Sequence, residues 1–169
     1  MMALFVWIEQ SALSVWVRES PSLLAFPFIL FLHTLGLALL AGISVALDLW
    51  LLMGAARARR IATRGLFRAM WLGFAINALS GVVLLAAYPA KALTNWVFYT
   101  KMVLILLALL ALEATRREVF DEARPGDTIV VTSRARALAI ASLAFWAGTI
   151  LTGRLLAYTY VILLASDPP

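Results

Sequence analysis

The residues of this chain that could do chemistry are polar side chains inside long apolar runs. His33, the sole histidine, lies in the stretch FLHTLGLALLAGISVALDLWLLMG, which also carries Asp48. Later apolar runs contain Asn77, Lys101 and Arg154. An ionisable or amide side chain inside such a run is costly to bury in lipid and generally faces other protein groups or a bound molecule. Each of these residues is therefore a candidate functional residue.

His33 has three interpretations that the sequence leaves open. Its imidazole could form a hydrogen bond with Asn77 or Ser80 on a neighbouring helix. It could ligate the iron of a haem b, whose two propionates would need cations such as Lys101 and Arg154. It could also hydrogen-bond a quinone headgroup together with Arg154.

The haem interpretation needs a second axial ligand, and the chain has no second histidine. Met102, or His33 of a second copy of the chain, could fill that position. Tyr158 follows Arg154 by four residues and therefore shares its helix face. The chain has no cysteine, which excludes disulfides, zinc-thiolate sites and iron–sulfur clusters ligated by it. No constellation typical of an enzyme stands out. The predicted cofactor-binding residues are His33, Asn77, Lys101, Arg154 and Tyr158.

The elements that position these residues are membrane-spanning helices. The chain is 64% hydrophobic and 14% charged, whereas apolar residues make up about half of an ordinary soluble domain. A spanning helix needs about 20 mostly apolar residues. Short connections between such segments favour an antiparallel arrangement. We therefore predict an all-α integral membrane four-helix bundle over residues 21–169, with Pro27 kinking its first helix. The predicted spans are residues 22–53, 67–88, 96–114 and 135–164.

Residues 1–20 predict a separate N-terminal element, an amphipathic helix lying in the membrane interface. Its tryptophans are typical of interfacial segments, and it is too short and polar to span a bilayer. Basic residues gather in the connections after the first and third spans. The positive-inside rule predicts that both connections face the cytoplasm, so that both termini lie outside a bacterial inner membrane. The net charge of +5 then reflects topology rather than nucleic-acid binding. The first connection holds Arg57, Arg59, Arg60 and Arg64, with Arg68 just inside the second span, and the other holds Arg116, Arg117, Arg124, Arg134 and Arg136.

Two carboxylates lie close to these basic connections. For Asp48 and Glu113 the simplest interpretation is a salt bridge at the membrane boundary, with Arg57 or Arg116 as partner. Small residues spaced four apart also predict close helix packing. The predicted packing seams are Ala38, Gly42 and Ala46, then Gly73, Asn77 and Gly81, and finally Ala144, Gly148 and Thr152.

Four stretches resemble a family of small, uncharacterised bacterial four-helix inner-membrane proteins. They are HTLGLALLAGISVALDLWLLMG, the pair Ser80 and Gly81, NWVFYTKMVL from Asn95, and GRLLAY from Gly153. In layout this family is similar to copper-resistance D and cytochrome b561-type membrane bundles, whose histidines bind haem b or metal. Many members of the resembled family carry a further histidine near the inner end of the third span, where this chain reads LALEATRR around Glu113. The resemblance therefore leaves only His33 for such a role.

These observations predict a small membrane subunit of an electron-transfer system that holds haem b or a quinone. The alternative is a non-catalytic scaffold or accessory subunit of a larger membrane complex. A small transporter is the third prediction and ranks below both, because broken helices and internal repeats typical of many carriers are not evident. The predicted partners are membrane lipids, further copies of the chain or other membrane subunits, and no nucleic acid.

Overall fold

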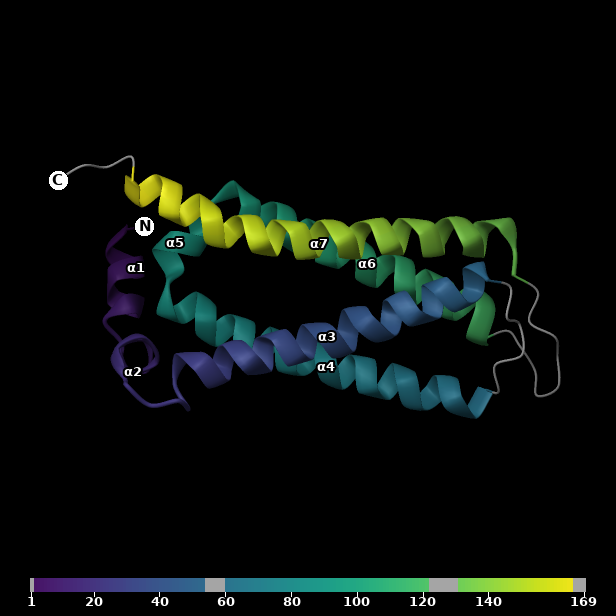
Figure 1. The fold of residues 1–169 in the computed structure, drawn as a ribbon, viewed down its shortest axis with the longest axis horizontal. Helices are drawn as coiled ribbons and strands as arrows, with labels where there is room; N and C mark the ends of the chain where they lie inside the picture. Colours follow the sequence, from purple (N-terminus) through teal and green to yellow (C-terminus); the bar gives the residue numbers. More distant parts are fainter. Residues whose placement is uncertain (1, 54–59, 122–130, 166–169) are drawn as a thin grey trace.

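The computed structural model describes residues 2–53, 60–121 and 131–165. Four helices in these ranges are long and apolar enough to cross a membrane, and they run alongside one another as a bundle (Figure 1). This confirms the predicted all-α membrane bundle, and the chain is a multi-pass membrane protein. The four helices are α3 (Phe26–Leu52), α4 (Arg60–Ala87), α6 (Trp96–Thr115) and α7 (Ser133–Ala165).

The starts of two helices show how the local sequence determines where a helix begins. Pro27 occupies the first turn of α3, where its missing N–H breaks no helical hydrogen bond; the predicted kink there is therefore wrong. Asn95 caps α6, since its Oδ1 accepts a hydrogen bond of 3.0 Å from the Val97 N–H. The Asn95 amide also donates to the Thr159 hydroxyl at 2.9 Å. The start of α6 is thereby tied to α7.

The four long helices form two pairs. α3 packs against α4, α6 packs against α7, and α3 also contacts α7. Figure 1 shows the pairs meeting at one end of the bundle and separating toward the other. We call the first the arginine end, because Arg116 and Arg117 follow α6 there in the short π-helix η1 (Arg116–Asp121). At the other, capped end lie α1 (Met2–Glu9), α2 (Ala12–Glu19) and α5 (Pro89–Leu93).

The buried core lies in the arginine-end half of the bundle. Its centre joins all four long helices through Leu40, Met70, Leu112 and Trp146, which are 5% exposed or less. The Trp146 indole N–H donates to the Ser44 hydroxyl at 2.9 Å, so its polar atom is satisfied inside the core. Interlocking side chains of this kind drive helix association in lipid, where the hydrophobic effect does not act between helices.

Glycines allow α3 and α4 to approach at their backbones. A Cβ on Gly36 would lie 2.5 Å from the Asn77 nitrogen, and one on Gly73 would lie 2.9 Å from the Gly36 oxygen. The predicted seam on α4 is thus confirmed at Gly73 and Asn77. The predicted seam on α3 is wrong, because Gly42 and the alanines four residues either side of it are exposed. Gly36 takes their place, since its side of α3 is the one that faces α4.

The N-terminal segment forms two short helices, α1 and α2, instead of the one predicted over residues 1–20. Ser11 interrupts them, because its hydroxyl accepts from the Ser14 N–H and starts α2 as an N-cap. The Ser14 hydroxyl then donates to the Ala86 carbonyl at 2.7 Å, and Arg18 Nη1 donates to the Ala87 carbonyl at 3.2 Å. Carbonyls in the last turn of a helix have no partner within it. Helix α2 therefore caps the end of α4.

Candidate functional site

Hydrogen bonds to α4 fix His33 on α3. Its Nδ1 lies 3.0 Å from the Asn77 backbone oxygen, and the Asn77 amide donates to the His33 carbonyl at 2.7 Å. A carbonyl oxygen can only accept, so Nδ1 carries the proton. The predicted hydrogen bond between His33 and Asn77 is confirmed. Nε2 of the neutral ring is left with a free lone pair.

Ser80 and Gly81 form the surface on which the imidazole rests. The Ser80 hydroxyl donates to the Ile76 carbonyl at 2.6 Å and lies 3.2 Å from His33 Nδ1, which it can accept from. A Cβ on Gly81 would lie only 3.1 Å from Cε1 of the ring. The glycine therefore provides the space that the ring occupies.

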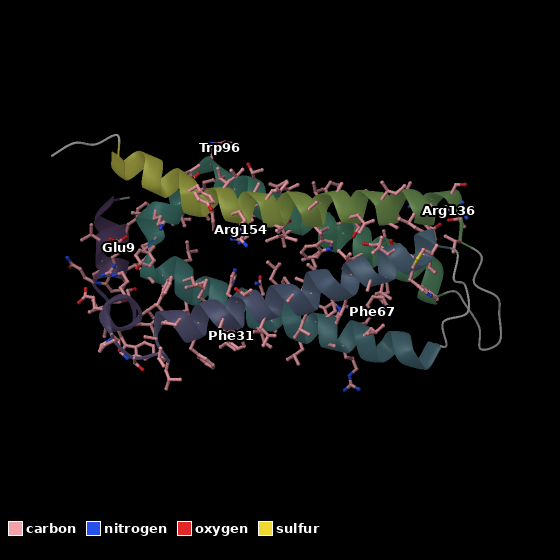
Figure 2. The ribbon with its side chains drawn as sticks, viewed as in Figure 1. Glu9, Phe31, Phe67, Trp96, Arg136 and Arg154 are labelled. Carbon is pink, nitrogen blue, oxygen red and sulfur yellow. The ribbon has the colours of Figure 1, made fainter. Side chains whose placement is uncertain are left out.

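The other helix pair brings two cations to the same half of the bundle. The half-buried Lys101 of α6 reaches α7, where its Nζ lies 4.0 Å from the position of a Cβ on Gly153. Figure 2 shows the next residue, Arg154, pointing from α7 toward α3 and α4. The structure thus confirms that His33, Asn77, Lys101 and Arg154 share one half of the bundle.

These two cations lack a counter-charge. Across the residues that the structure describes, neither Lys101 nor Arg154 forms a hydrogen bond or an ion pair. Tyr158 is 65% exposed and has no hydrogen bond to Arg154. Tyr158 was predicted to share a helix face with Arg154, but the two side chains are not hydrogen-bonded. Unpaired cations at membrane depth are costly, so an anionic group is the partner that they fit.

The described residues do not fit a haem with two axial ligands from one chain. His33 offers Nε2, but Met102 is 41% exposed on α6 and lies one residue away from the inward-directed Lys101. Consecutive residues of a helix point about 100° apart. Nowhere in the described parts of the chain do three His, Asp or Glu side chains gather in a way that could hold a metal ion.

The two carboxylates of the arginine-end half have different environments. Glu113 forms ion pairs with Arg116 at 2.7 Å and Arg117 at 2.8 Å, which confirms a boundary salt bridge. Asp48 is 1% exposed and lies against Ser142 of α7. The boundary interpretation is therefore wrong for Asp48, because its helix face is the one that packs on α7. Its other predicted partner, Arg57, lies outside the described residues.

The polar face of α7 was missed by the sequence analysis. Ser142 and Thr149 are buried, and both lie on the face that carries Trp146. Their spacing of four and then three residues is the signal that could have revealed a single helix face. Hydroxyl residues are common in membrane helices, however, and the spacing alone does not show which neighbour they meet.

No protein-family model matches the chain, and no solved structure gives a significant match. A curated protein named undecaprenyl-diphosphatase, from Anaeromyxobacter dehalogenans (strain 2CP-C), is 33% identical to it over 129 residues. The alignment covers 69% of this chain and 44% of that protein. The chain therefore spans less than half the length of this relative.

This similarity corrects the predicted function. The name of a diphosphatase points away from an electron-transfer subunit, so that prediction is wrong, and the scaffold alternative gains no support. The resemblance to the uncharacterised four-helix family stays a prediction, as does binding of any cofactor. Over about two thirds of its length, this membrane protein is similar to a protein named for acting on a diphosphate.

Proposed function

We propose that this chain binds the diphosphate headgroup of a polyprenyl lipid in the capped-end half of the bundle and cleaves the bond between its two phosphates. The observation that supports the proposal is the pair of cations, Lys101 and Arg154, which have no carboxylate partner among the described residues. The substrate class comes from the name of the relative.

Each side chain has a role that follows from its chemistry. The planar guanidinium of Arg154 can bind a phosphate through two parallel hydrogen bonds, while Lys101 supplies a compact positive charge. Together they neutralise charge on the two phosphates as the bond between them breaks, which is the main requirement of phosphoryl transfer. Both come from the pair α6 and α7.

His33 is suited to activate the attacking water. Its Nδ1 donates to the Asn77 carbonyl, so the free Nε2 can accept a proton from water. The water oxygen then bonds to the terminal phosphorus, and the bond from that phosphorus to the bridging oxygen breaks. The products are inorganic phosphate and the lipid monophosphate, and the proton held by His33 is released to solvent.

Phosphate release from a polyprenyl diphosphate by the purified protein in detergent tests this function. We expect His33→Gln, Lys101→Met and Arg154→Met each to lower the rate by about 100-fold, since removal of one group that stabilises developing charge has an effect of that order. Arg68→Met is the matched control, because Arg68 is exposed like Arg154 but lies near the start of α4, at the arginine end and away from the proposed site. Binding without phosphate release would overturn the catalytic half of the proposal, and the absence of both would overturn all of it.

The proposed orientation puts this site nearer the outer face of a bacterial inner membrane. It rests on the positive-inside rule, applied to the arginines at the arginine end. The chain has no native cysteine, so a single introduced cysteine reports one position. A membrane-impermeant thiol reagent added to intact cells should label Ser22→Cys at the capped end and leave Arg136→Cys unlabelled. The reverse pattern would overturn the orientation.

A further inference from the structure

Among the residues that the structure describes, three buried polar atoms have no partner within ordinary hydrogen-bonding geometry, and their residues come from two facing helices. They are Oδ2 of Asp48 on α3 and the hydroxyl oxygens of Ser142 and Thr149 on α7. All three residues are 1% exposed or less. Buried polar groups are almost always paired, so an unpaired carboxylate oxygen needs an explanation. The residues lie in the well-packed half of the bundle, away from His33.

No positive charge neutralises Asp48 within the described residues. Arg68 of α4 and Arg136 of α7, on the two helices that pack against α3, are exposed, and neither forms an ion pair with Asp48. On α6, Glu113 is itself held by Arg116. A carboxylate buried without a cation is strongly disfavoured, and such a group takes up a proton instead.

A metal ion fits this place poorly. Helices α3 and α7 are unbroken around Asp48 and Ser142, so their backbone carbonyls are occupied by helical hydrogen bonds. Thr149 lies seven residues from Ser142, which is about 10 Å along the helix. One carboxylate and one hydroxyl are too few oxygens for cations that take about six ligands. A proton needs fewer partners, because it binds one carboxylate oxygen and needs only one further oxygen, that of a hydroxyl, to accept its hydrogen bond.

We propose that Asp48 is a proton-binding site buried between α3 and α7, and that its carboxyl group is protonated in the closed bundle. The bound proton turns one carboxyl oxygen from an acceptor into a donor, which the Ser142 hydroxyl can accept. One proton is taken up from solvent, and no other bond changes. Release of that proton leaves a charge that only water can stabilise, so it favours separation of α3 from α7. This site does not depend on the proposed hydrolysis.

Infrared spectroscopy of the full-length protein, labelled with carboxyl-13C aspartate, tests the proposal. At neutral pH we expect a carbonyl band of a protonated carboxylic acid that shifts with the label. The band should disappear in Asp48→Asn and remain in Glu113→Gln, the matched control at the paired carboxylate. Ser142→Ala should shift the band without removing it, because the acid loses its acceptor.

The wild-type spectrum tests the protonation of Asp48 even if the Asp48→Asn variant does not fold. Absence of a label-sensitive band at neutral pH would show that the carboxyl group is ionised and would overturn the proposal. A band that is unchanged in Ser142→Ala, or that persists in Asp48→Asn, would place the proton on another aspartate and would also overturn it.

Discussion

The two halves of this bundle are built from the same four helices but are packed differently. The arginine-end half buries Leu40, Met70, Leu112 and Trp146 in one core. The capped-end half instead holds His33 and two cations that have no partner among the described residues, and neither hydrophobic core cluster lies there. The comparison indicates that the closely packed core and the proposed binding site are separated along the bundle axis. Stability is expected to come from the first half and chemistry from the second.

The largest effect on stability is expected from truncation of Trp146, the central tryptophan of the core. Trp146→Ala removes a 1% exposed side chain and its bond to Ser44, so we expect the free energy of unfolding to fall by about 3–5 kcal/mol. Denaturant titration in mixed micelles measures it. Trp96→Ala is the control, because Trp96 is 74% exposed on α6. Equal losses in the two variants would contradict a core confined to the arginine-end half.

A second test adds volume where α3 and α4 meet. Gly36→Val places a side chain 2.5 Å from the backbone of Asn77, and we expect a loss of about 1–3 kcal/mol in the free energy of unfolding. Gly42→Val serves as control, since nothing lies within 4 Å of a Cβ there. If both valines are tolerated equally, the backbone contact at Gly36 does not exist.

A smaller effect is expected from the hydrogen bonds that hold His33. Asn77→Ala removes the donor to the His33 carbonyl and should lower the free energy of unfolding by about 1 kcal/mol. The same titration measures it. Thr34→Ala is the comparison, because Thr34 bonds only its own helix at Leu30 and is exposed. A larger loss in Thr34→Ala than in Asn77→Ala would argue against this link between α3 and α4.

The smallest effect on stability is expected at the two cations. Lys101→Met and Arg154→Met break no hydrogen bond or ion pair of the described residues. We expect each to change the free energy of unfolding by less than about 0.5 kcal/mol, while both lower phosphate release. A large loss of stability in either variant would show that its cation has a structural partner, and the contrast between the halves would then fail.

The fold was largely predictable because the apolar pattern of a spanning helix is repeated many times along each segment. Every residue of a spanning segment adds to the apolar pattern, and four segments of sufficient length left one architecture open. The positions of His33 and Lys101 along their helices could also be predicted, because each residue of an α-helix adds a fixed rise along its axis. These residues were therefore placed correctly in one half of the bundle.

It was much harder to predict which side of each helix faces the other helices. In lipid, the outside of a membrane helix is as apolar as its inside, so hydropathy does not show which side meets protein. Gly42 looked like a packing residue and is exposed, while Gly36 was overlooked and touches α4. Asp48 was placed at the boundary for the same reason. Only the contact with Ser142, a residue distant in sequence, reveals its environment.

The cap on α4 also has a consequence for the order of assembly. Ser14 and Arg18 are made early, but the carbonyls that they bind, at Ala86 and Ala87, follow about seventy residues later in the chain. Synthesis at roughly 5–20 residues per second leaves a delay of about 4–14 s. During that interval α2 has no end of α4 to bind. The capped end therefore closes only after α3 and α4 have been synthesised, and it closes late although α2 precedes both helices in the chain.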